Sequence, residues 1–322
     1  MERWTARKVV ILGAGAVGST FAYALAQSGV ADEITLMDMD LNLVQGQVMD
    51  LAHGLPFYPN VQITVGSAQD YADAHVIVIT AGSKQRPGES RLSLLQRNAC
   101  IIESVMDEIA AQGSQAVVVL VSNPVDILTY VAQQRVHWPR GRVIGSGTVL
   151  DSARFRYLLS QHCGVNVHNV HAYILGEHGD SEFAAWSMTH VAGMKFDEYC
   201  QMCGDCQDWQ EERRKIEEAV RTSAYHIIGY KGATYFAVGQ ALVRIVSAIV
   251  RNERSVLSVS TVLEGEYGLS GVCLGIPAMV GEAGVERVLE MDLPADERSA
   301  LERSAGILKQ ALAQLSLSES QD

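Results

Sequence analysis

The stretch Lys8–Thr20, KVVILGAGAVGST, decides the fold of this chain. Residues 9–12 are an apolar, mostly β-branched run, which is typical of a strand buried on both faces. The spacing Gly13-x-Gly15-x-x-Gly18 follows, and a helix is expected from about Gly18. The first glycine allows a tight turn, the second lets backbone amides approach a pyrophosphate, and the third lets helix and strand pack closely.

A second apolar strand, Glu33–Met37, ends at Asp38. A carboxylate about 20 residues beyond the glycines binds the ribose hydroxyls of a dinucleotide. Because the same charge repels a 2′-phosphate, this arrangement favours NAD over NADP. Taken alone, the glycine pattern also fits a turn that only closes a loop, since glycine turns after strands are common.

Strands and helical segments alternate up to about residue 146, which indicates parallel βαβ units. Further strands are expected at 61–65, 76–80, 116–121 and 143–144, and helices at 41–51, 92–111 and 125–134. Six strands of this kind complete a dinucleotide-binding domain. We therefore expect an α/β protein with a Rossmann-type doubly wound parallel sheet over residues 1–146, followed by an α+β substrate-binding and catalytic domain over residues 147–322.

Beyond Gly147 the pattern changes to long helices separated by short strands. Helices are expected at 151–161, 209–228, 234–251 and 296–315, and strands at 255–263 and 272–280. The first of these helices has Ala153, Tyr157 and Leu158 as its expected apolar positions. The last one has apolar residues at steps of three and four, which predicts a docked helix, namely Leu301, Ala305, Leu308, Leu312 and Leu315.

Composition narrows the class of protein. The 322 residues carry a formal net charge of −12, which argues against nucleic acid and anionic membranes as partners.

Residues 9–31 are uncharged and follow a basic segment, as in a signal peptide or membrane anchor. However, four glycines and the polar Ser19, Gln27 and Ser28 favour a strand–turn–helix there. We therefore expect a cytoplasmic protein.

The strongest candidate for chemistry is His178 in the segment LGEHGDS, residues 175–181. It lies between Gly176 and Gly179, where the backbone can bend tightly and a substrate can come close. Imidazole exchanges a proton near neutral pH, which hydride transfer to a ketone requires. A histidine of this kind, taken alone, is more often a structural residue of a core or turn.

Three further residues accompany His178. Asp151 and Arg154 lie three apart and so share one face of a helix. An aspartate beside a histidine orients the ring, and an arginine binds a carboxylate with its planar fork. Arg91 ends the polar segment 83–91, which Pro and Gly interrupt, and a mobile loop there would let it swing in and polarise a carbonyl. The alternatives are a surface ion pair and a solvated loop charge.

Two strand ends complete the predicted ligand-binding edge. The strand 76–80 runs into Ala81 and Gly82, a small-residue turn that lets backbone pass close to a cofactor. The strand 116–121 runs into Ser122 and Asn123. Since parallel sheets of this class bind ligands at the carboxyl ends of their strands, we expect Asn123 to face the ligand.

Six motifs, in the order GAGAVGS, AGSKQRPGESR, SNPVDI, SGTVLDSARFR, LGEHGDS and KGATYF, resemble those of the bacterial-type L-lactate dehydrogenases of the lactate/malate dehydrogenase family. The similarity runs from about Lys8 to Leu315. It implies a homotetrameric, NAD-dependent enzyme that reduces pyruvate reversibly to L-lactate in glycolysis and pyruvate fermentation. It implies no metal.

The resemblance also implies roles for particular residues. His178 matches the proton donor and acceptor, Asp151 its partner, and Arg91 the residue that polarises the substrate carbonyl. The residues that match substrate contacts are Arg154, Gln85, Asn123 and Thr234. Those that match cofactor contacts are Gly13, Gly15, Val17, Gly18, Asp38, Ala81, Gly82, Ser122, Asn123, Ser146 and Val238. Bacterial relatives bind the activator fructose 1,6-bisphosphate between subunits, and the allosteric residues that match here are Arg156 and His171.

Two other kinds of function remain open at this stage: a dehydrogenase of malate or of another, bulkier 2-hydroxy acid, and a protein that only binds NAD. In malate dehydrogenases an arginine two residues before the loop proline holds the second carboxylate of the substrate; this chain has Gln85 there, although Arg86 is adjacent and a slipped loop would present it. A catalytically silent NAD-binding sensor is the other alternative, and the set of His178, Asp151, Arg154 and Arg91 argues against it.

One motif has no match in the family. Cys200-x-x-Cys203-x-x-Cys206 fits a thiol metal site or a redox switch, but no fourth ligand is evident. The alternative is a variable surface segment with incidental thiols.

Overall fold

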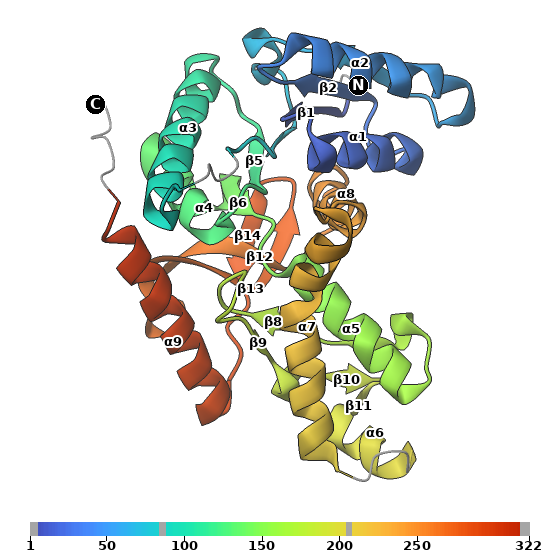
Figure 1. The fold of residues 1–322 in the computed structure, drawn as a ribbon, viewed down its shortest axis with the longest axis vertical. Coiled ribbons are helices and arrows are strands. Elements are labelled where there is room, and N and C mark those ends of the chain that lie inside the picture. Colours follow the sequence, from blue (N-terminus) through green and yellow to red (C-terminus); the bar gives the residue numbers. More distant parts are fainter. Residues whose placement is uncertain (1–5, 84–87, 204–207, 316–322) are drawn as a thin grey trace.

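The computed structural model of the protein describes residues 6–83, 88–203 and 208–315. Within these residues, nine strands form one sheet in the order β14-β13-β12-β6-β5-β4-β1-β2-β3 (Figure 1). The strands are β1 (Lys8–Leu12), β2 (Glu33–Met37), β3 (Gln62–Val65), β4 (Val76–Ile79), β5 (Val117–Leu120), β6 (Val143–Gly145), β12 (Ser255–Glu264), β13 (Ser270–Gly281) and β14 (Gly284–Val288). The strands β1 to β6 are parallel and have the order 3-2-1-4-5-6, which confirms the predicted doubly wound sheet.

Helices cover both faces of the parallel strands because successive strand residues point to opposite sides. The helices on one face are α3 (Arg91–Ala111), α4 (Val125–Val136) and α9 (Ala295–Leu312), and those on the other are α1 (Ala16–Ser28), α2 (Leu41–His53) and α8 (Phe236–Val250). Val10, Ile77 and Val118 belong to the core under α3, α4 and α9. Their neighbours Val9 and Val76 belong to the core under α1, α2 and α8.

A third core holds together the part of the chain at the lower right of Figure 1. It is built around aromatic side chains, with Trp186 packed edge-on against Phe155 and Phe196. The helices of this part are α5 (Val149–Cys163), α6 (Phe196–Cys203) and α7 (Trp209–Lys231). Its short strands are β7 (Val170–His171), β8 (Ile174–Leu175), β9 (Phe183–Ala184), β10 (His190–Val191) and β11 (Met194–Lys195).

The main sheet continues from the N-terminal half into the C-terminal half. Ser260 of β12 pairs antiparallel with Gly145 of β6, so β12, β13 and β14 extend the parallel sheet. Local sequence patterns indicated β6, β12 and β13 but not β14. They could not indicate the β6–β12 pairing, because its two partners lie far apart in the chain. The division of the chain at residues 146 and 147 stays a prediction.

The predicted apolar face of α5 was wrong at Ala153 and Tyr157, whereas Leu158 does pack against the third core. Ala153 and Tyr157 are exposed and Leu158 is half-buried. The buried side of the helix carries Asp151, Ser152, Phe155, Leu159, Ser160 and Cys163. Polar residues lie on this side because they are satisfied by specific partners, and an apolar periodicity cannot reveal such partners.

The predicted docking face of α9 was right: Leu301, Ala305 and Leu308 are buried, and Leu312 and Leu315 are packed against the same core. Among the described helices, none has the length and apolar character needed to cross a membrane.

Candidate active site

The glycine turn after β1 has the geometry that a dinucleotide requires. A Cβ on Gly18 would lie 1.8 Å from the carbonyl oxygen of Gly13, so this close approach of α1 to the turn admits only glycine. Gly13 has φ +106°, which other residues rarely adopt, whereas the space beside Gly15 is open for 4 Å. The N-cap residue of α1 is Gly15, which has no side chain to cap this helix end. Its free N–H groups therefore fit the phosphates of NAD.

Asp38 lies beside this turn, immediately after β2. Its Oδ2 accepts a hydrogen bond of 2.7 Å from the backbone N–H of Ala14, and its Oδ1 accepts one of 3.0 Å from Asp40. The half-buried carboxylate is thus held in place by backbone and keeps further acceptor capacity for ribose hydroxyls.

The predicted ligand-binding edge after β4 and β5 is held together by polar contacts. The Ser122 hydroxyl donates to the carbonyl of Ala81 at 2.5 Å. Buried Asn98 of α3 accepts from the backbone of Ser83 at 2.9 Å and donates to the carbonyl of Asn123 at 3.5 Å. Asn98 was not predicted, although a polar residue within the apolar stripe of a helix is the signal that could have found it.

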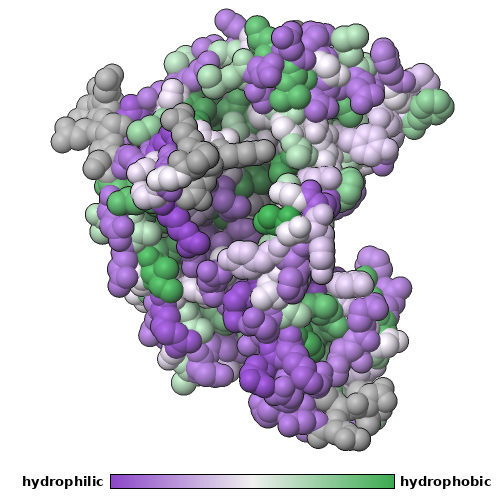
Figure 2. All heavy atoms as spheres, viewed as in Figure 1, coloured by the Kyte–Doolittle hydropathy of each residue, from purple (hydrophilic) through white to green (hydrophobic). Residues whose placement is uncertain are grey.

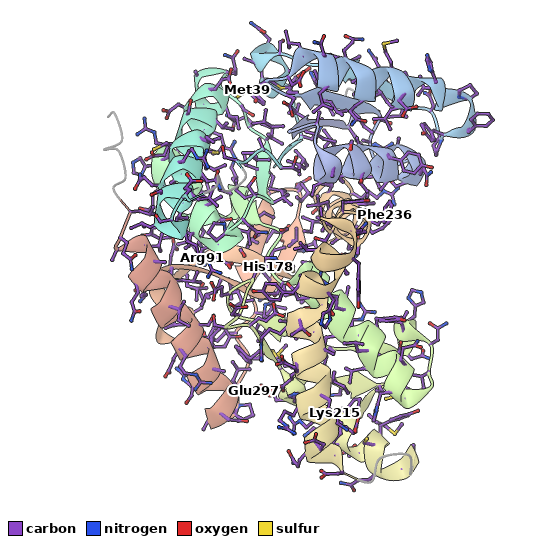
Figure 3. The ribbon with its side chains drawn as sticks, viewed as in Figure 1. Met39, Arg91, His178, Lys215, Phe236 and Glu297 are labelled. Atoms are coloured by element: carbon purple, nitrogen blue, oxygen red, sulfur yellow. The ribbon has the colours of Figure 1, made fainter. Side chains whose placement is uncertain are left out.

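A cavity of about 300 Å³ brings together residues that are widely separated in the sequence. The predicted residues that line it are Val17, Asn123, Ser146, Arg154, His178, Thr234 and Val238. The face drawn in Figure 2 is hollowed near its centre, and His178 lies near that position in the same view (Figure 3). Cofactor-side and substrate-side predictions therefore converge on one cavity.

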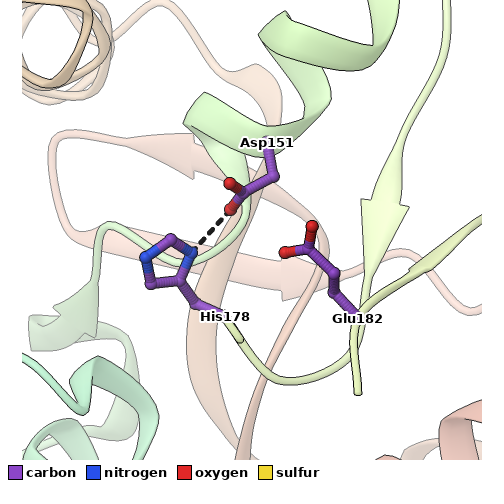
Figure 4. A group of neighbouring side chains, drawn as sticks. All are labelled: Asp151, His178 and Glu182. Atoms are coloured by element: carbon purple, nitrogen blue, oxygen red, sulfur yellow. Dashed lines mark hydrogen bonds and ion pairs between the residues drawn. The ribbon is translucent and has the colours of Figure 1, made fainter. Parts of the chain in front are cut away.

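Asp151 joins the two polar groups of this cavity. Its Oδ2 lies 2.6 Å from Nδ1 of His178 (Figure 4), and its Oδ1 accepts from Nη1 of Arg154 at 2.7 Å. The Asp151 side chain is 2% exposed, while that of His178 is 25% exposed. Asp151 lies in the first turn of α5, where the helix dipole favours a negative charge. The bond at Nδ1 leaves Nε2 of His178 for a substrate.

These contacts shift the proton affinities of the pair. Burial opposes a charge on His178, but the negative charge of Asp151 and its hydrogen bond outweigh burial and raise the pKa of His178 to about 9. Burial likewise opposes the charge of Asp151, yet His178 and Arg154 keep the pKa of Asp151 below its usual value. His178 is therefore an imidazolium at neutral pH, with Asp151 as its counter-ion.

Backbone contacts fix the loop that carries His178. Gly176 and Gly275 of β13 exchange backbone hydrogen bonds of 3.0 and 2.9 Å. The N–H of His178 donates to Oδ2 of Asp126 at 2.8 Å, and Asp126 also accepts from the hydroxyl of Ser260. Burial raises the pKa of Asp126 to about 6. Asp126 was not predicted, because in the segment SNPVDI it reads as an ordinary acid at a helix start.

Some predicted residues lie outside the cavity. Arg91 is exposed and is the first residue of α3, and Figure 3 shows it toward the same central region as His178. Gln85 and the adjacent Arg86 lie outside the described residues. Arg156 and His171 line a separate cavity of about 580 Å³.

The cysteine motif lies partly outside the described structure. Cys200 is buried in α6, with its Sγ 3.8 Å from Nε2 of His162. The side chain of Cys203 and all of Cys206 lie outside the described residues.

A doubly wound sheet with this glycine turn, and a buried aspartate–histidine pair beside an arginine, define a nicotinamide-dependent dehydrogenase. Residues 7–145 match the family model described as the lactate/malate dehydrogenase NAD-binding domain, and residues 148–317 match the alpha/beta C-terminal domain of the same family. The chain belongs to the lactate/malate dehydrogenase family, and NAD is its cofactor.

Relatives at high identity span nearly the whole chain. An L-lactate dehydrogenase of Treponema denticola is 61% identical over 96% of this chain and 98% of its own length. An L-lactate dehydrogenase of Acetivibrio thermocellus is 49% identical over 97% of this chain and 98% of its own length. Among solved structures, the minor L-lactate dehydrogenase of Enterococcus mundtii in its ligands-bound form superposes with a TM-score of 0.94 at 40% identity, covering 98% of this chain and 100% of that chain.

Proposed function

We propose that this enzyme is an L-lactate dehydrogenase, which reduces pyruvate reversibly to L-lactate with NADH. The observation that carries the proposal is the Asp151 carboxylate, which bonds both His178 and Arg154 in the cavity beside the dinucleotide edge. One carboxylate thus holds a proton donor and an anion-binding guanidinium at a fixed separation. This arrangement suits a small substrate with a carboxylate next to a carbonyl.

Each residue of the site then has a role in the reaction. Arg154 binds the substrate carboxylate, and Nε2 of protonated His178 donates to the ketone oxygen. Bound NADH supplies the hydride to the ketone carbon. Asp151 keeps the ring oriented and stabilises its charge until the proton leaves. Asn123 lies near the reacting oxygen, and Arg91 approaches to polarise the carbonyl. In lactate oxidation neutral His178 takes the proton back.

A mixing assay tests this function. Oxidation of NADH on addition of pyruvate, followed by the nicotinamide absorbance, is the expected result. Faster oxidation with oxaloacetate than with pyruvate would contradict the proposal and favour malate dehydrogenase. No oxidation with either ketone would favour the NAD-binding sensor.

The assembly that we propose is a homotetramer, acting in the cytoplasm on the pyruvate and NADH of glycolysis. Large apolar side chains on the surface of the single chain support assembly: Tyr230 is 89% exposed, and Tyr157, Tyr225 and Phe236 are also exposed. Figure 3 shows Phe236 at the edge of the molecule. Light scattering on the purified protein measures its mass in solution, and a monomeric mass would contradict this assembly.

The activator that we propose is fructose 1,6-bisphosphate, bound by Arg156 and His171. Support comes from the cavity of about 580 Å³ that these residues line together with His168. The Nε of Arg156 donates to the carbonyl of Val170 at 2.8 Å, which holds the arginine beside β7. Arg156 and Arg244 supply positive charge to this cavity and the histidines supply ring nitrogens, and such groups are suited to a phosphate ester.

We expect the activator to lower the pyruvate concentration that half-saturates the enzyme. Replacing Arg156 by Gln or His171 by Asn should abolish this effect without changing the rate at saturating pyruvate, because neither residue lines the catalytic cavity. Saturation curves measured with and without millimolar activator check this expectation. Identical curves for the unmodified enzyme would overturn it.

A further inference from the structure

Glu182 is a buried carboxylate that the proposed mechanism does not use. It follows the segment LGEHGDS directly and is 7% exposed. One carboxylate oxygen of Glu182, one of Asp151 and one ring nitrogen of His178 lie within 4.8 Å of one another (Figure 4). Within the described residues, no hydrogen bond or ion pair engages the Glu182 side chain, and its oxygens are not among the fully buried atoms without a partner, because Glu182 lines a cleft.

Two other acids nearby, buried Glu297 and half-buried Glu217, are engaged differently. Glu182 also lines a cleft of about 660 Å³ between α7 and α9. In the same cleft Glu297 accepts from the N–H and hydroxyl of Ser187, and Glu217 accepts from the indole N–H of Trp186. Of these three acids, Glu182 is the one that lies within 4.8 Å of the catalytic pair.

Charged groups face Glu182 from every element around it. Asp151 and Arg154 come from α5, and His178 and Asp180 come from the loop before Glu182. The remaining charged groups of the cleft are Arg213, Arg214, Glu217 and Arg221 of α7 and Asp296, Glu297 and Arg303 of α9. These charges have mixed sign, and Asp151 is the negative charge that lies within the closest group.

The three-residue group is poorly suited to a metal ion. Both oxygens of Asp151 are already engaged, and the guanidinium of Arg154 lies against one of them. A divalent cation would be repelled by this charge. Two carboxyls beside one imidazole are better suited to holding protons.

We propose that Glu182 is a positioning residue for proton transfer, which exchanges its own proton with water in the cleft and thereby sets the pH at which His178 loses its proton. The inference rests on the proposed function and extends it. No bond is made or broken other than the O–H bond of the Glu182 carboxyl.

The negative charge that Glu182 gains on losing its proton gives the direction of the effect. Burial and the charge of Asp151 raise the pKa of Glu182 to about 8, while the pKa of His178 is about 9. Once Glu182 has lost its proton, its negative charge stabilises the imidazolium of His178, which lies within the same 4.8 Å group. Since pyruvate reduction needs the imidazolium, Glu182 extends the active range toward alkaline pH.

Glu182→Gln tests this inference, because an amide of nearly the same shape stays neutral at every pH. We expect the titration of the His178 ring, followed by NMR, to move about half a pH unit toward acid. The alkaline limb of kcat/KM for pyruvate should move equally, while kcat/KM at acid pH should change less than about twofold. The His178→Asn variant identifies the His178 resonance among the nine histidines.

Glu297→Gln is the matched control, since it removes another buried glutamate of the same cleft and should leave the His178 titration in place. Glu182→Asp keeps an ionisable carboxyl and should restore part of the shift; it also provides the test if Glu182→Gln does not fold. An unchanged His178 titration in both Glu182 variants would overturn the inference. Absence of pyruvate turnover in the unmodified enzyme would instead overturn the proposed function, and the NMR titration would still test Glu182.

Discussion

His178→Asn is expected to lower pyruvate turnover by about 10²- to 10⁴-fold while NADH binding stays nearly unchanged. The variant loses both the proton donor and the 2.6 Å contact with Asp151 that orients it. The backbone N–H that donates to Asp126 is retained, so the loop should keep its position. The glycine turn and Asp38, which serve the dinucleotide, lie on other elements and are unaffected.

Steady-state kinetics and a fluorescence titration with NADH measure the two quantities separately. His190→Asn is the control: His190 pairs with His171 in the small sheet, its ring contacts the carbonyl of Met188, and it lies outside the catalytic cavity. This control should keep normal turnover. Retention by His178→Asn of more than about a tenth of turnover would refute the role of His178, because general acid catalysis contributes far more than that.

Gln85→Arg is expected to switch the substrate from pyruvate toward oxaloacetate. By resemblance, Gln85 and Thr234 border the space beyond the ketone carbon, where pyruvate has a methyl group and oxaloacetate a carboxylate. An unpaired buried charge costs roughly 3–5 kcal/mol, enough for about two to three decades of discrimination. The new arginine would pair with that carboxylate, and it would itself be unpaired with pyruvate. The ratio of kcat/KM for the two ketones measures the switch.

Arg86→Gln is the control for the position of the loop. Both residues lie outside the described part of the chain, so their register rests on the resemblance alone. The control should keep the preference for pyruvate. A large change in the substrate ratio for Arg86→Gln, with none for Gln85→Arg, would mean that Arg86 holds the specificity position and would favour malate.

Residues embedded in local patterns were the ones that sequence analysis could find. The glycine spacing and the acid at Asp38 predicted a strand–turn–helix, and the structure has β1 and α1 there. His178 and Asp151 were paired on chemical grounds, and the structure places them 2.6 Å apart. Their functional roles stay predictions until variants are measured.

Residues that act through distant partners could not be found in this way. Asp126 contacts His178 and Ser260, which lie far away in the chain, and nothing in its own neighbourhood indicates either contact. The same reason explains the misassigned face of α5, where Ser152 is buried because it contacts the hydroxyl of Ser258 at 3.0 Å. Burial of a polar side chain depends on tertiary partners, whereas periodicity records only apolar ones.

The pairing of Gly145 with Ser260 bears on how such enzymes can be recombined. If the cofactor-binding half is exchanged between relatives at residues 146 and 147, the continuous sheet is divided between β6 and β12. The β6 strand of one parent must then pair with the β12 strand of the other. The exchange also carries Asp126 away from the Ser260 hydroxyl and the His178 N–H that satisfy it. Gly141 and Gly284 add a steric condition, since a Cβ on Gly284 would lie 1.9 Å from the Gly141 carbonyl oxygen. A working chimera must therefore take the residues that make these contacts from one parent, or from two parents that have the same residues at these positions.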